Sequence, residues 1–135
     1  MSSAMRNALI VLALVSVACM DDEIVGGTTV TGAYVLRTVN GSPPPVTVAG
    51  SGANKTEVLD DVITLFEGGS YAENGHTRVT ANGQTTTEII SETGRYTPLG
   101  NSITLTSTTN RTRVATSDAK WMKIVEAEVT WFYSK

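Results

Sequence analysis

The segment Arg-Val-Thr-Ala-Asn-Gly-Gln-Thr-Thr-Thr-Glu-Ile-Ile, residues 78–90, decides the fold class of this 135-residue chain. Two runs rich in β-branched residues, Arg78–Ala81 and Thr85–Ile90, flank the dipeptide Asn82-Gly83. Both residues of that dipeptide tolerate the positive φ angles of a tight antiparallel turn. The segment therefore predicts a β-hairpin whose turn lies at residues 82 and 83.

Segments of the same kind fill much of the remaining chain. Turn signals separate them at short intervals: Asn40-Gly41, Gly50-Ser51-Gly52, Gly68-Gly69, Asn74-Gly75 and Gly100-Asn101. Between the turns apolar and polar residues alternate, which is typical of strands that pack one face on a core. The last segment is expected to be one strand with a single inward row: Val125, Ala127, Val129, Trp131 and Tyr133. Residues 53–61 compete as a helix but fit a strand or loop. These patterns predict an all-β sandwich or barrel.

Residues 1–19 predict export. Arg6 precedes the apolar run 8–18, which has the length of a signal peptide and is shorter than the roughly 20 residues that cross a bilayer. Cys19, the only cysteine, follows that run directly. Residues 16–18 also satisfy the small-x-small rule of an ordinary secretory signal, so two kinds of cleavage are open.

The chain divides into a signal peptide (1–18), a short tether (19–30) that is first acidic and then rich in Gly and Thr, and one domain (31–135). Without Arg6 the chain carries nine basic and thirteen acidic side chains. The basic residues form no stripe in the sequence, so we expect no binding to nucleic acid.

Two parts of the chain resemble known families. Cys19 after its apolar run resembles the lipobox of bacterial lipoproteins, in which the cysteine thiol is joined to a diacylglycerol. Residues 32–45, Gly-Ala-Tyr-Val-Leu-Arg-Thr-Val-Asn-Gly-Ser-Pro-Pro-Pro, resemble the first strand and turn of small bacterial lipocalin-like lipoproteins. Residues 94–105 resemble the central hairpin of the same proteins. The resemblance implies a small antiparallel up-and-down β-barrel, calycin-like, with about eight strands. It also implies attachment to a membrane through acylated Cys19, on the outer membrane facing the periplasm.

Five aromatic residues are expected to point into the barrel: Tyr34, Tyr71, Tyr96, Trp131 and Tyr133. Such residues either fill a small barrel or line a cavity for a small hydrophobic ligand. Four glutamates at strand positions are interpreted as outward-facing charges, with paired hydrolytic carboxylates as the alternative: Glu88, Glu92, Glu126 and Glu128.

His76, the only histidine, is placed by the sequence near a turn at Asn74-Gly75. Zinc sites need several His or Cys ligands, and the chain holds one histidine and one cysteine. We therefore expect no metal. The sequence has neither a Gly-x-Ser-x-Gly elbow nor a phosphate-binding glycine loop, so we also expect no cofactor and no catalytic residues.

The leading hypothesis is a non-enzymatic, lipid-anchored β-barrel of the cell envelope that binds a small hydrophobic molecule or an envelope component. The first alternative is a structural or protein-interaction module with a filled barrel. The second is a secreted, inhibitor-like barrel that acts through its loops, of which residues 42–45 form the stiffest.

Overall fold

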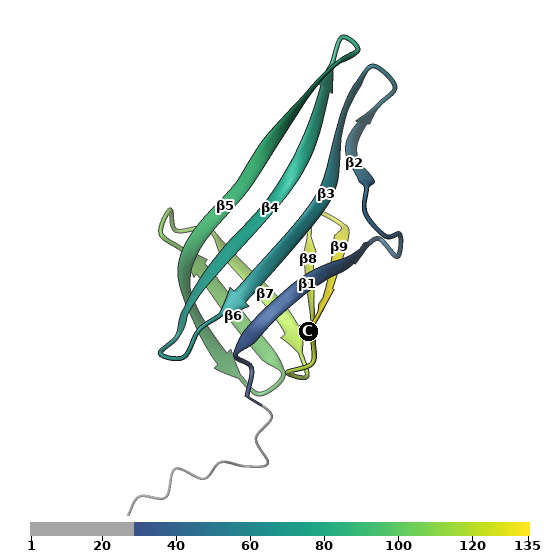
Figure 1. The fold of residues 1–135 in the computed structure, drawn as a ribbon. Coiled ribbons are helices and arrows are strands. Elements are labelled where there is room, and N and C mark those ends of the chain that lie inside the picture. Colours follow the sequence, from purple (N-terminus) through teal and green to yellow (C-terminus); the bar gives the residue numbers. More distant parts are fainter. Residues whose placement is uncertain (1–28) are drawn as a thin grey trace, which may run out of the picture.

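The structure, a computed structural model, describes residues 29–135 (Figure 1). The predictions for the signal peptide, for Cys19 and for most of the tether lie outside these residues. The described residues form strands and no helix. The strands are β1 (Gly32–Val39), β2 (Val46–Ser51), β3 (Asn54–Leu65), β4 (Ser70–Ala81), β5 (Gln84–Leu99), β6 (Ser102–Ser107), β7 (Thr112–Ser117), β8 (Trp121–Glu126) and β9 (Val129–Ser134). No helix within residues 29–135 therefore has the length and apolar character that crossing a bilayer requires.

The predicted up-and-down barrel is confirmed. Each strand pairs antiparallel with its neighbour in the chain from β2 to β9, and β1 closes the ring by pairing with both β9 and β3. Tyr34 of β1 lies opposite Ile63 of β3, and Val35 lies opposite Ser134 of β9. Strand β2 pairs only with residues 54–58 of β3, so the closed ring contains eight strands and β2 flanks it.

The predicted hairpin at residues 82 and 83 is also confirmed. Asn82 and Gly83 have φ angles of 51° and 77°, and the strands on either side pair from Ala81 opposite Gln84 onward. Residues 53–61, which fitted a strand or loop, lie largely in β3.

The predicted turn at Asn74-Gly75 is wrong. Asn74 and Gly75 lie in the middle of β4, and His76 therefore lies in a strand. Glycine is needed there for space, because a Cβ at position 75 would stand 2.5 Å from the backbone oxygen of Asp60 on β3. The local signal resembled that of a turn, but its cause is contact with a neighbouring strand.

The last segment is a hairpin, not the single strand that the alternation predicted. β8 ends at Glu126 and β9 begins at Val129, while Ala127 and Glu128 take φ angles of 46° and 66° in the turn between them. The predicted row is therefore broken: Val125 is 57% exposed on the outer face, whereas Tyr133 is buried.

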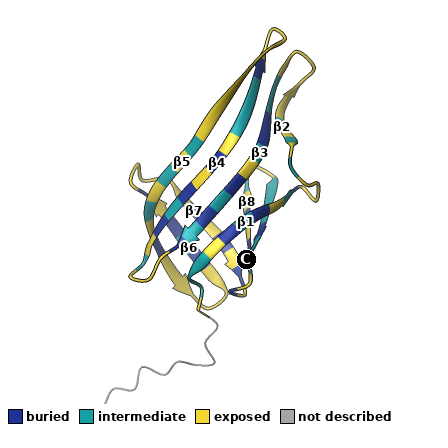
Figure 2. Ribbon diagram, in the orientation of Figure 1, coloured by how far each residue is buried: buried dark blue, intermediate teal, exposed yellow. Residues whose placement is uncertain are grey.

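The core fills the barrel at the end where residue 29 enters. Inward-facing apolar residues of every strand except β2 form its buried part, among them Tyr34, Leu36, Ile63, Leu65, Tyr71, Tyr96, Ile103, Leu105, Ala115, Met122, Ile124 and Tyr133. Their alternation with exposed residues gives the striped pattern in Figure 2. The burial follows directly from period two, because successive side chains of a strand point to opposite faces.

Strands β3, β4 and β5 are longer than the others and project beyond the ring (Figure 1). β2 covers one edge of this projection. On the other edge, β5 pairs with β6 only from Gly94 to Leu99, so residues 84–93 of β5 have a strand on one side alone. The projecting wall stands over one end of the barrel, and this end holds the candidate site.

Candidate functional site

A buried ion-pair cluster crosses the barrel between β4, β5 and β7. Arg113 of β7 donates two hydrogen bonds to Glu73 of β4, at 3.1 Å from Nη1 and 2.6 Å from Nη2, and a third from Nη2 to Glu92 of β5 at 2.7 Å. The side chain of Arg113 is 3% exposed and that of Glu73 is 6% exposed. Removing such charges from water is costly, and the two-pronged contact with Glu73 compensates because Nη1 and Nη2 both meet carboxylate oxygens, although Nε has no partner among the described residues.

Tyr71 ties the cluster to the packed core. Its hydroxyl donates to Glu92 Oε1 at 2.6 Å. Burial, followed by the hydrogen bond to Glu92, raises the pKa of Tyr71 to about 12. Burial alone would raise the pKa of Glu92, but the Tyr71 hydroxyl and the nearby guanidinium groups outweigh it and lower that pKa. Glu92 is therefore a carboxylate at neutral pH.

Arg111 extends the cluster to the rim. It precedes β7, is half exposed, and donates from Nη2 to both oxygens of Glu126 at 2.9 and 2.7 Å. Its Nη1 also reaches Glu92 at 3.3 Å. Glu92 and Glu126 thus face this network, which corrects the expectation that they point outward to solvent. Solvent competes for the rim pair, so it is held less firmly than the pair formed by Arg113 and Glu73.

Asp61 is a buried acid beside this cluster. It is 2% exposed, and the Tyr133 hydroxyl donates to its Oδ2 at 2.8 Å. Its Oδ1 has no hydrogen-bond partner among the described residues. Burial, followed by the charge of Glu73, raises the pKa of Asp61 to about 8. Asp61 is therefore largely a neutral carboxylic acid at neutral pH, since the charged form lacks both water and a cation in contact.

Gly75 gives Asp61 its room. A Cβ at position 75 would stand 2.7 Å from Asp61 Oδ1, closer than real contacts allow. The glycine that looked like a turn signal is thus part of the wall behind the buried acid.

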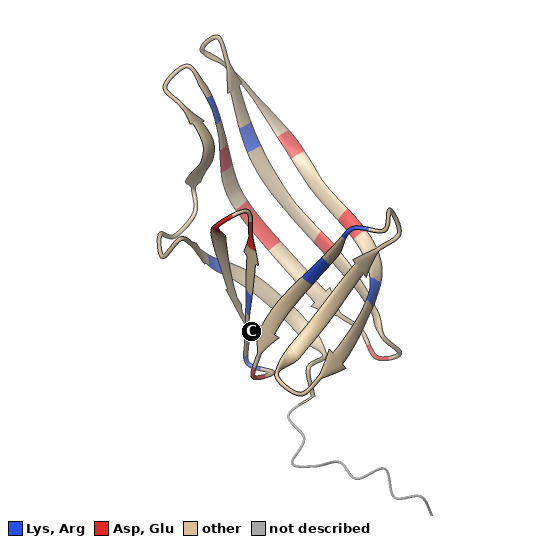
Figure 3. Cartoon of the chain, turned by 180° about the vertical axis from the view of Figure 1, so that it is seen from behind, with Lys and Arg blue, Asp and Glu red and all other residues tan. Residues whose placement is uncertain are grey.

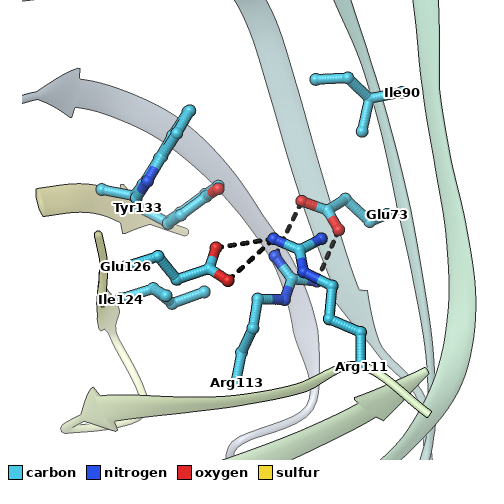
Figure 4. A pocket seen from close by; sticks show the side chains of 8 residues that line it. Glu73, Ile90, Arg111, Arg113, Ile124, Glu126 and Tyr133 are labelled. Atoms are coloured by element: carbon cyan, nitrogen blue, oxygen red, sulfur yellow. Dashed lines mark hydrogen bonds and ion pairs between the residues drawn. The ribbon is translucent and has the colours of Figure 1, made fainter. Parts of the chain in front are cut away.

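A cavity of about 150 Å³ opens beside the cluster (Figure 4). Charged and apolar side chains share its lining: Glu73, Ile90, Arg111, Arg113, Ile124, Glu126, Trp131 and Tyr133. Glu126 ends β8, and Lys135 at the other end of this hairpin donates to the Thr29 backbone oxygen at 3.0 Å. The cavity therefore lies toward the barrel end away from residue 29. An apolar floor with charged walls can hold a small molecule that has both kinds of surface.

The structure brings together two of the five predicted aromatic residues at this cavity. Trp131 and Tyr133 are among its lining residues, and Trp131 is half-buried. Tyr34, Tyr71 and Tyr96 are buried in the core cluster and are not among the described residues that line the cavity. Their hydroxyls are occupied: Tyr34 donates to the Val30 oxygen at 2.6 Å, and Tyr96 donates to the Phe66 oxygen at 2.8 Å.

His76 lies on the outer face of the β3–β4 wall. Its Nδ1 lies 2.8 Å from Oδ1 of Asp60, and both side chains are about half exposed. Among residues 29–135 no group of three or more His, Cys, Asp or Glu residues is arranged to hold a metal ion. His76 is therefore a surface residue on the side of the wall opposite Glu73 and Gly75.

The sequence favours a solvated acidic turn at Asp60-Asp61, but this expectation is wrong because Asp61 lies in β3 and is buried. The sequence analysis also missed Glu73, Arg111 and Arg113. A weak signal existed for two of them, because Glu73 shares the strand parity of Tyr71, and Arg113 shares that of Ala115. A charged residue in an inward row indicates a buried partner. It does not identify the partner, which here comes from a strand 40 residues away.

The chain was compared with models of protein families, with curated proteins and with solved structures, and none of the three comparisons found a match. The closed antiparallel barrel of residues 32–134 is consistent with a lipocalin-like fold.

Proposed function

We propose that the protein is a non-enzymatic binding protein of the bacterial cell envelope, anchored by acylated Cys19, that holds a small molecule at the mouth of its barrel. The observation that carries the binding role is the cavity bordered by Trp131, two isoleucines, two arginines and two glutamates. The anchor rests on the sequence, in which Cys19 ends a signal-like apolar run. The lipocalin-like shape of the domain supports the binding role.

The lining favours a small amphipathic ligand over a wholly apolar one. Ile90, Ile124 and Trp131 offer apolar contact. A purely apolar ligand would also strip water from the rim pair of Arg111 and Glu126 and give no hydrogen bond in return, which is unfavourable. A cavity of about 150 Å³ limits the bound portion to a small group. The ligand that fits best has an apolar body inside and a polar or charged head at the rim.

Two neighbouring isoleucines allow a matched test. Ile90 lines the cavity, whereas Ile89 is 74% exposed on the opposite face of β5. We expect Ile90→Trp to fill the cavity and abolish ligand binding, and Ile89→Trp to leave binding unchanged.

The measurement is native mass spectrometry of wild type and both variants, extracted from their own membranes in mild detergent. We expect the wild type to carry the mass of acyl chains on Cys19 and a co-purified small molecule, and Ile90→Trp to carry the acyl chains alone. Equal ligand occupancy in wild type and Ile90→Trp would contradict the binding site. Unmodified Cys19 would contradict the anchor.

The second candidate function is a protein-interaction module whose barrel interior is filled by side chains. The edge of β5 that has no neighbouring strand, residues 84–93, favours it. Residues 84–89 are exposed on both faces, and the β6–β7 loop meets this edge only where Thr108 N donates to the Thr93 oxygen. By strand parity, the backbone N–H and C=O groups of Thr85, Thr87 and Ile89 point the same way as those of Thr93, toward the open side. A partner strand can pair there. Slower hydrogen exchange of these amides in intact membranes than in purified protein would favour this candidate.

A further inference from the structure

Four basic residues gather on one outer wall of the barrel. Arg37 lies on β1, Lys123 on β8, Lys120 directly before β8 and Lys135 directly after β9, and all four are exposed. Their strands are neighbours, as the pairing of β1 with β9 and of β9 with β8 requires. Figure 3 shows basic positions around the marked C-terminal end. We call these four residues the basic wall.

Contacts along the wall join its members. Arg37 Nε donates to Ser134 Oγ on β9 at 2.8 Å, and the backbone N of Lys135 donates to the Lys120 oxygen at 3.0 Å. Lys123 lies opposite Phe132 in the β8–β9 pair. These contacts place the four residues on neighbouring segments of the chain.

The basic wall also differs from the other cations in its partners. Of the nine basic residues within 29–135, Lys55, Arg78, Arg111 and Arg113 form ion pairs with glutamates, and Arg95 donates to a backbone oxygen. None of the ion pairs found among the described residues involves the basic wall. Arg37, Lys120 and Lys123 thus remain available to an external anion, whereas the Lys135 ammonium donates to the Thr29 backbone oxygen and lies 5.1 Å from the centre of the Tyr34 ring.

An aromatic pair lies in the middle of the wall. The rings of Trp121 and Phe132 are 6.0 Å apart and tilted by 31°, and both side chains are half-buried. Trp121 lies opposite Ser134, and Phe132 lies opposite Lys123. Aromatic rings beside Lys and Arg are the residues that favour the headgroup region of a bilayer.

Among the described residues, one acidic side chain lies at the wall. Asp118, in the turn before β8, accepts the backbone N–H groups of Lys120 and Trp121 at 2.9 Å each. Desolvation alone would raise the pKa of Asp118, but these contacts and the Lys120 charge outweigh it and lower that pKa, so Asp118 offsets one of the positive charges. Glu126 and Glu128 lie at the far end of the β8–β9 hairpin, and Glu126 is paired with Arg111. The wall keeps a positive excess near the end where the chain enters.

The entry point of the tether identifies what the wall faces. Lys135 Nζ donates to the backbone oxygen of Thr29, so residue 29 enters beside the basic wall. Nine residues, 20–28, separate Thr29 from Cys19, and a fully extended chain of that length spans about 30 Å. A bilayer that holds Cys19 is therefore within reach of the wall.

We propose that the basic wall, with Trp121 and Phe132, docks onto the anionic phospholipid surface of the membrane that holds the anchor. The inference rests on the proposed lipid anchor for the identity of that surface. Phospholipid phosphates bind Arg37, Lys120 and Lys123, and the two rings enter the headgroup region. Docking through a side wall lays the strands along the bilayer, so that the cavity mouth opens sideways and not into the lipid.

The test uses the acylated protein in vesicles of phosphatidylcholine with or without 30% phosphatidylglycerol, both made with brominated acyl chains. In a Trp131→Phe background Trp121 is the one remaining tryptophan, so bromine quenching of its fluorescence reports contact of the wall with lipid. We expect strong quenching in the anionic vesicles, and weak quenching in neutral vesicles or in 0.5 M salt. Lys123→Glu should abolish the difference, whereas Arg95→Glu on β5 should retain it.

The outcomes separate the wall from the anchor. Protein that stays on both kinds of vesicle with equal or no quenching keeps the anchor and overturns the docking. If mass spectrometry finds no acyl chain on Cys19, the proposed anchor is wrong, and co-sedimentation of the protein with the same vesicles then measures the docking by itself. In that case we expect the protein to bind only the anionic vesicles, and salt to weaken this binding. Lys123→Glu should lower the affinity about fivefold or more. Absence of that binding overturns the proposal, as does binding to a soluble polyanion without quenching by lipid.

Discussion

Asp61→Asn should make the protein markedly more stable in alkaline solution than the wild type. The Asp61 carboxyl is 2% exposed, and burial raises its pKa to about 8. Asparagine has the same shape and no charge at any pH. Its oxygen can still accept the Tyr133 hydroxyl that Asp61 Oδ2 accepts at 2.8 Å. The substitution therefore removes the titration and keeps the packing.

The size of the effect follows from proton linkage. An aspartate in the unfolded chain loses its proton near pH 4, whereas Asp61 in the folded protein keeps its proton up to a pH of about 8. Between these values the folded state binds a proton that the unfolded state has lost. The contribution of Asp61 to stability is fully present below about pH 4 and falls by about 1.4 kcal/mol for each unit of rising pH. From pH 5 to pH 8 the loss amounts to roughly 4 kcal/mol.

Urea unfolding at pH 5, 6.5 and 8, followed by circular dichroism, measures this directly. The free energy of unfolding of Asp61→Asn minus that of the wild type should grow by roughly 4 kcal/mol across the range. The exposed Glu88→Gln serves as a control and should show a flat difference. A difference for Asp61→Asn that changes by less than about 1 kcal/mol would refute the reasoning, because Asp61 would then be ionised in the fold throughout.

Three further substitutions test other parts of the structure. Arg113→Leu leaves Glu73 and Glu92 without their buried cation and should lower the free energy of unfolding by about 3–5 kcal/mol in urea melts; a loss below about 1 kcal/mol would mean that water reaches the pair. Gly75→Ala should lower the free energy of unfolding by about 1–3 kcal/mol in the same assay, because the added Cβ would lie 2.5–2.8 Å from atoms of the neighbouring strand. An unchanged free energy of unfolding would disprove this close contact. His76→Ala removes the exposed contact with Asp60 and should change the free energy of unfolding by less than about 1 kcal/mol and leave ligand binding intact. Loss of ligand binding with an unchanged urea melt would instead give His76 a functional role.

Local chemistry explains which parts of the fold were predictable. The hairpin at Asn82-Gly83 was predicted because its turn depends on those two residues alone. Asn74-Gly75 has the same sequence signal, but glycine is needed there because β3 lies too close for a Cβ atom. The spacing of residues in the sequence does not reveal that contact. At Ala127 the sequence analysis made the opposite error and predicted a strand where the structure has a turn. Ala127 and Glu128 have positive φ angles but are not typical turn residues, so the pairing of β8 with β9 must fix the position of the turn.

The candidate site was harder to predict than the barrel. Trp131 and Tyr133 were expected to point inward from alternation alone, and both line the cavity. The charged partners were not expected, because Arg113 meets Glu73 only once the sheet has curved into a ring. A hydrophobic pattern records which residues are buried, but it holds no information on which buried charges will face each other across a closed interior.

The double pairing of β1 has a consequence for the order of folding. β1 joins β3 on one side and β9, the last strand of the chain, on the other, with contacts as distant as Arg37 to Ser134, 97 positions apart. A chain that leaves a ribosome or a translocation channel amino end first presents β1 early and β9 last. The ring therefore stays open until residues 129–134 have emerged, and contacts of such long range form slowly. Until then local hairpins such as β4–β5 can form, but the closed ring cannot.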